Sequence, residues 1–77
     1  MPRLKCTFRE VIAIIEANGF EIVPARTSGS HRQYKRIVAG ETRLVTVAYH
    51  SINDDVLPDT LSSIIRQSGL PKRLFRK

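Results

Sequence analysis

The chain has 77 residues, which is enough for one small domain, spanning residues 1–77, and excludes a second. Its 13 Lys and Arg outnumber its 7 Asp and Glu, which gives a net charge of +6. A charge of this size favours binding to a polyanion such as nucleic acid; the alternatives are an acidic protein partner or a charge that only keeps the chain soluble. One cysteine and two histidines exclude a disulfide and a four-ligand zinc site, and no apolar run approaches a membrane span, so we expect a cytoplasmic protein with no cofactor and no membrane contact.

The first predicted element is a helix from about Phe8 to Asn18. Thr7 and Glu10 have the spacing of a capping box, in which each side chain accepts a hydrogen bond from the other residue's amide. Apolar residues then recur at helical spacing: Phe8, Val11, Ile12 and Ile15. Gly19 follows as a C-terminal cap, because glycine adopts the left-handed conformation that ends helices.

Three strands are expected next. Residues 20–23 are rich in apolar and β-branched side chains, and Pro24 restricts this strand to an edge or ends it. Residues 31–38 form a second strand, residues 39–42 a turn, and residues 43–49 a third strand with the clearest alternation of the chain. Short connections predict an antiparallel meander.

A second helix begins near Pro58, since proline is favoured in the first helical turn. Three acids flank this start and are read as capping groups at the positive end of the helix dipole: Asp54, Asp55 and Asp59. Gly69 and Pro71 end the helix. The basic tail, residues 72–77, either adds a helical turn or frays.

The order α-β-β-β-α predicts an α+β fold with a three-stranded antiparallel sheet, both helices on one face and the other face free. Double-stranded-RNA-binding modules share this order. Their second helix begins with basic residues, however, whereas the acids around Pro58 would repel a phosphate. The standard docking on an RNA duplex is therefore disfavoured.

His31 is the candidate active residue. Gly29 and Ser30 precede it, and small residues let a ligand approach the backbone closely. If Tyr34 packs under the helices, strand alternation directs His31 and Lys35 to the free face. The alternative is that Gly29 and Ser30 are only turn residues and His31 an exposed strand residue.

Other reactive side chains are weaker candidates. His50 follows the third strand and is either a second proton donor or a cap of the strand end. Cys6 precedes the Thr7 cap and is expected to be a small buried residue rather than a nucleophile. No metal site is predicted, because the acids are assigned to helix capping.

Several motifs occur together in one order: Gly29-Ser30-His31, then Val45-Thr46-Val47 with His50, then Thr60-Leu61-Ser62-Ser63-Ile64-Ile65-Arg66-Gln67-Ser68-Gly69-Leu70. In this order and spacing the chain closely resembles the HicA-type mRNA interferase toxins of bacterial toxin–antitoxin pairs. The resemblance implies a double-stranded-RNA-binding-like fold, ribosome-independent cleavage of mRNA, His31 as the catalytic histidine, and neutralisation by a HicB-type antitoxin that covers the site.

The implied chemistry is reasonable for a histidine. Metal-free RNA cleavage can use the substrate's 2′-OH as nucleophile, so the protein supplies a proton acceptor and cations. His31 would accept the proton, and His50 or a water would protonate the leaving oxygen. Candidate phosphate contacts are Arg26, Arg32, Lys35 and Arg43. The alternative function is a non-catalytic RNA-binding or antitoxin-docking module of the same fold.

Overall fold

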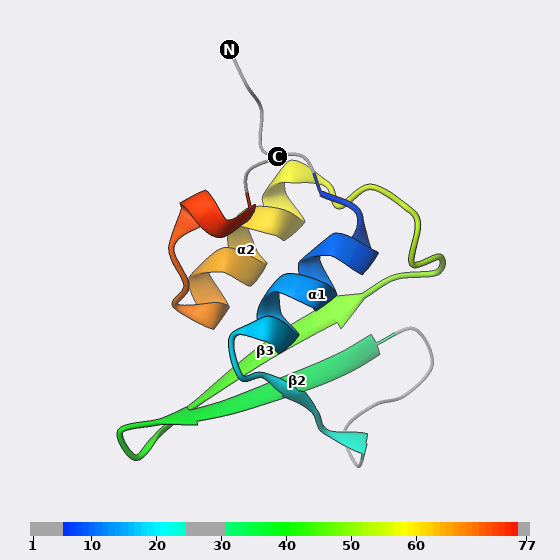
Figure 1. The fold of residues 1–77 in the computed structure, drawn as a ribbon. Coiled ribbons are helices and arrows are strands. Elements are labelled where there is room, and N and C mark those ends of the chain that lie inside the picture. The colour runs from blue at the N-terminus through cyan, green and yellow to red at the C-terminus, as the bar shows by residue number, and fades with distance from the viewer. Residues whose placement is uncertain (1–5, 25–30, 76–77) are drawn as a thin grey trace.

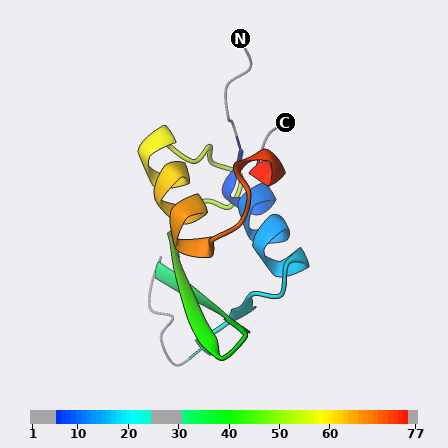
Figure 2. The same ribbon diagram turned by 90° about the vertical axis from the view of Figure 1, so that its left-hand side faces the viewer.

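Two helices lie on one face of a three-stranded sheet, as Figure 1 and, from the side, Figure 2 show. This computed structural model describes residues 6–24 and 31–75. The elements, in the predicted order, are α1 (Phe8–Ala17), β1 (Glu21–Ile22), β2 (His31–Val38), β3 (Glu41–Ala48), α2 (Pro58–Ser68) and the 3₁₀ helix η2 (Lys72–Phe75). The predicted α+β fold is confirmed, and both helices cover the same face.

The N-terminus of α1 is built by its own sequence. The Thr7 amide donates to Glu10 Oε1 over 2.9 Å, and the Glu10 amide donates to Thr7 Oγ1 over 3.3 Å, which completes the predicted capping box. The amides of Phe8 and Arg9 donate to carbonyls in the 52–54 loop. The free N–H groups at this helix end are thus satisfied within the protein.

The sheet is an antiparallel meander in the order β1-β2-β3, so the short strand β1 lies at an edge as predicted. The turn between β2 and β3 is shorter than expected. Ala39 and Gly40 both have positive φ, 53° and 79°, and this two-residue turn lets Val38 pair directly with Glu41. The predicted turn through residue 42 was wrong because nothing in the sequence marks Ala39 as left-handed.

The core lies between the sheet and the helices. Tyr34, Val45 and Val47 face it from the sheet, and the predicted apolar stripe of α1 faces it from above. Burial, reinforced by the negative charge of Glu16, raises the pKa of Tyr34, so its hydroxyl stays protonated. Side chains alternate along each strand, so every second side chain lies on the opposite face of the sheet, and no helix of the described residues covers that face (Figure 2).

Helix α2 begins with Pro58 at its first position and ends at Gly69, whose φ of 70° gives the predicted left-handed cap. The three acids were expected to cap this helix, but only Asp59 lies in its first turn. The N-cap residue is Leu57, which provides no side-chain cap. Near the other end, Gln67 Oε1 accepts a hydrogen bond from the Thr46 amide over 3.1 Å, which covers part of the exposed edge of β3.

The described part of the basic tail, residues 72–75, adds a helical turn that is folded against the core. Phe75 of η2 is fully buried, and its carbonyl accepts a hydrogen bond from Cys6 Sγ over 2.9 Å. Cys6 is therefore the buried small residue that the sequence predicted. None of the helices in the described residues is long and apolar enough to cross a bilayer.

Candidate active site

His31 is the first residue of β2, and its side chain is exposed on the uncovered face of the sheet. The register places it opposite Ala48, the last residue of β3. Tyr34 fixes the orientation, because its buried ring leaves His31, Gln33 and Lys35 on the outer face. The predicted outward orientation of His31 is confirmed.

The core side of the same strand end is held by aromatic stacking. The Arg32 guanidinium lies 4.6 Å from the centre of the Tyr49 ring, and the Tyr49 ring centre lies 5.3 Å from that of Phe8. A cation over an aromatic face is attractive, so this stack ties the start of β2 and the end of β3 to α1. Tyr49 was expected only as the last residue of the third strand and not as part of the site; the observed strand β3 ends one residue earlier, at Ala48.

His50 lies two residues beyond Ala48 and is exposed. Antiparallel pairing places the start of β2 beside the end of β3, so both histidines belong to the same end of the sheet. The suggested cap of the strand end is not observed, since among residues 6–24 and 31–75 the His50 side chain has no hydrogen-bond partner. It is accessible to a ligand at that end.

The outer face next to His31 is polar. Gln33 Nε2 donates to Thr46 Oγ1 over 3.3 Å, across the strand pair adjacent to His31. Lys35 is exposed on this face and pairs in register with Glu21 of β1. Lys35 is four residues from His31, about 13 Å along the strand. This is within reach of a neighbouring phosphate of a bound polymer.

The remaining predicted contacts are distributed differently. Arg32 and Arg43 lie on the helix-covered side of the sheet, Arg32 on Tyr49 and Arg43 beside Gly69 at the far end of β3. The structure therefore does not bring Arg43 to His31. Arg26, Gly29 and Ser30 lie outside the described residues.

The described side chains provide no metal site. In the described part of the chain, no three His, Cys, Asp or Glu side chains gather as a metal site requires. The Cys6 thiol is fully buried behind Phe75, which separates it from the His31 end. The outer face presents the His31 imidazole, on a strand held in place from its core side, and the Lys35 ammonium group, while the exposed His50 lies beyond the same end of the sheet. This set suits proton transfer on a bound anion.

Comparison with known proteins bears on this arrangement. The family model described as the HicA toxin of bacterial toxin–antitoxin systems matches residues 8–70, which include both helices, the whole sheet and His31. A search of curated proteins and a search of solved structures each returned no match. Because the family match extends over most of the 77 residues, the chain belongs to the HicA toxin family of bacterial toxin–antitoxin systems.

Proposed function

We propose that this toxin is a metal-independent endoribonuclease that cleaves mRNA, with His31 as its general acid–base residue. The observation that carries the proposal is the position of His31. It is an exposed imidazole on the uncovered face of the sheet, at a strand end that the stack of Arg32, Tyr49 and Phe8 holds in place. A positioned but accessible histidine is the arrangement that proton transfer requires.

In the proposed reaction, the RNA lies across the outer face with a phosphodiester next to His31. His31 accepts the proton of the adjacent 2′-hydroxyl, the 2′-oxygen bonds to phosphorus, and the bond from phosphorus to the 5′-oxygen breaks. His50 or a water gives the leaving oxygen its proton. Lys35, about 13 Å along β2, holds a neighbouring phosphate of the RNA and so helps to position the phosphodiester at His31. An HicB-type antitoxin would neutralise the toxin by covering this face.

This mechanism predicts the chemical ends of the products. Attack by the 2′-oxygen leaves a 2′,3′-cyclic phosphate on the upstream fragment and a 5′-hydroxyl on the downstream fragment. Mass spectrometry of the fragments from one defined RNA distinguishes these ends. Fragments with a 3′-hydroxyl and a 5′-phosphate would show that water attacks instead, and would exclude the proposed role of His31.

Cleavage is also expected to continue in the presence of a chelator. The proposed nucleophile belongs to the substrate, and Asp59, the acid of the first α2 turn, is already accounted for by the helix dipole. Rates measured in EDTA and in added Mg²⁺ should agree within about twofold, since neither condition changes a step of the reaction. Activity that disappears in EDTA and returns with Mg²⁺ would contradict this mechanism.

A further inference from the structure

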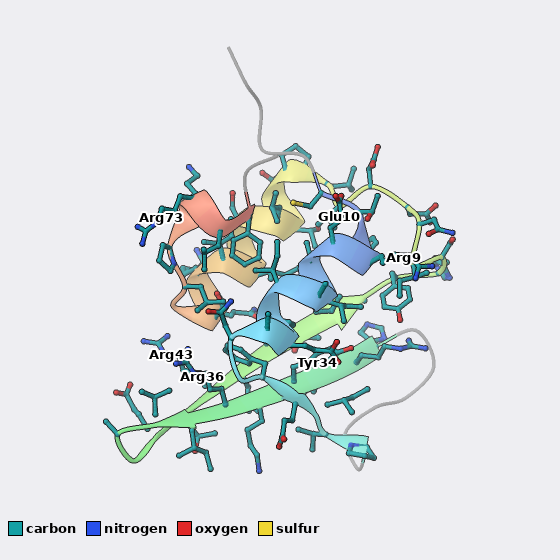
Figure 3. The ribbon with its side chains drawn as sticks, in the orientation of Figure 1. Arg9, Glu10, Tyr34, Arg36, Arg43 and Arg73 are labelled. Carbon is teal, nitrogen blue, oxygen red and sulfur yellow. The ribbon has the colours of Figure 1, made fainter. Side chains whose placement is uncertain are left out.

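Two arginines lie opposite each other at the hairpin end of the sheet. Arg36 of β2 pairs in register with Arg43 of β3, on the face that the helices cover. Each lies at the C-terminus of one helix. Arg36 Nε is 3.5 Å from the place a Cβ atom would take at Gly19, and Arg43 Cζ is 2.7 Å from that place at Gly69. Figure 3 shows the two side chains together below both helix ends.

This pair has no acidic partner within the described residues, where neither guanidinium forms a hydrogen bond or an ion pair. Like charges directly opposite each other in a sheet are destabilising. The two helix C-termini each carry about −0.5 of an elementary charge and so offset roughly half of the two positive charges. A net charge of about +1 is left, which equals in size the charge of one phosphodiester.

The surroundings add to this positive charge. Arg66 lies in the last turn of α2, and Lys72 and Arg73 follow Gly69 in η2. Asp59, in contrast, lies at the opposite end of α2. Two acids also lie at this end: Glu16 in the last turn of α1, and Glu41 at the start of β3, two residues before Arg43. Five basic side chains, those of Arg36, Arg43, Arg66, Lys72 and Arg73, outnumber these two acids, so this end of the described molecule keeps a positive charge.

We propose that Arg36 and Arg43 together bind a phosphodiester group of the RNA substrate, at a site separate from His31. This inference rests on the proposed ribonuclease function. Guanidinium groups bind phosphate oxygens through paired hydrogen bonds, and two of them can grip one phosphate. A phosphodiester offers two non-bridging oxygens, one for each guanidinium, and RNA is the polyanion that the proposed function already brings to the protein.

The geometry sets the length of RNA involved. Arg36 is five residues from His31, or about 17 Å along β2. Stacked nucleotides advance about 3.4 Å each, so a strand touching both sites spans at least about five nucleotides. The two sites lie on opposite faces of the sheet, so an RNA strand that contacts both must pass around an edge of the sheet. The pair would add affinity for RNA without reading its sequence, because phosphate contacts carry no base information.

The test is the affinity of 2′-O-methyl RNA, a 12-mer that has no free 2′-hydroxyl and stays intact. The variants are Arg36→Gln, Arg43→Gln and the double change, and Arg73→Gln is the control, since it removes one exposed charge outside the pair. The double variant should bind about tenfold more weakly, as expected for loss of a charge-assisted contact. Its salt dependence should fall by about 0.7 in slope for one lost phosphate.

Thermal unfolding separates this role from a purely structural one. Removing the repulsion between the two guanidiniums should leave the double variant as stable as the original chain or more so. A destabilised double variant with unaltered RNA affinity would mean that the two arginines only stabilise the helix ends. Single variants at Arg36 or Arg43 that lose no more RNA affinity than Arg73→Gln loses would also contradict the proposed site. If the original chain cleaves RNA and the double variant binds it normally, this site is wrong and the proposed function stands; if the original chain neither binds nor cleaves RNA, both fail.

Discussion

Replacing His31 with alanine is expected to slow RNA cleavage by about 10²- to 10⁴-fold, the usual effect of losing a general acid–base group. Growth inhibition should disappear with it. The fold should remain, because the His31 side chain is exposed on the face of the sheet opposite the core. Surface substitutions of this kind change the free energy of unfolding by no more than about 0.5 kcal/mol. Activity and stability should therefore separate in one variant.

His50→Ala is the matched control for this change. His50 is also an exposed histidine at the same end of the sheet, but it lies beyond the last residue of β3 and a water can replace it as proton donor. Its loss should lower the rate much less than the loss of His31. If His31→Ala loses activity only because it unfolds, His31 is structural. If the original chain and both variants bind RNA equally and none of them cleaves it, His31 has no catalytic role. The function is then the non-catalytic binding module.

Phe75→Ala should destabilise the fold by about 3–5 kcal/mol, the typical cost of removing a buried aromatic ring. Phe75 is fully buried although it lies near the end of the chain, and its loss leaves a cavity next to Cys6. A 77-residue domain has a total stability of roughly 4–12 kcal/mol, so this change removes a large share of it. Urea unfolding followed by circular dichroism measures the effect.

Leu74→Ala is the neighbouring control. Leu74 is 37% exposed and loses much less buried area, so it should cost about 1 kcal/mol or less. Equal and small effects of the two changes would mean that η2 does not pack on the core as described. A large effect of Phe75→Ala alone would establish that the C-terminal segment is part of the folded domain.

The elements that short-range chemistry determines could be predicted from the sequence. The Thr7 capping box and the Gly69 cap set two helix ends through contacts within a few residues. Strand alternation placed the His31 side chain on the face of the sheet that Tyr34 does not occupy. Those rules need no knowledge of the rest of the fold. The face of His31, on which the candidate site depends, was therefore predictable.

Features that depend on distant contacts were not predictable. The burial of Phe75 depends on Cys6 at the other end of the chain, and the position of Tyr49 depends on Arg32 and Phe8. The pairing of Arg36 with Arg43 at both helix ends required the helix directions over the sheet. A charge count finds a basic chain but does not locate its basic end.

The central claim, that His31 performs the chemistry, is tested most directly by single-turnover cleavage. One end-labelled RNA is incubated with excess original chain or excess His31→Ala, after thermal unfolding has established that both are folded. Excess enzyme removes differences in affinity, so the rates compare the chemical step alone. A rate for His31→Ala that is lower by about 10²-fold or more is the predicted result. A rate within about twofold of the original chain would contradict the assignment of His31 as the catalytic residue.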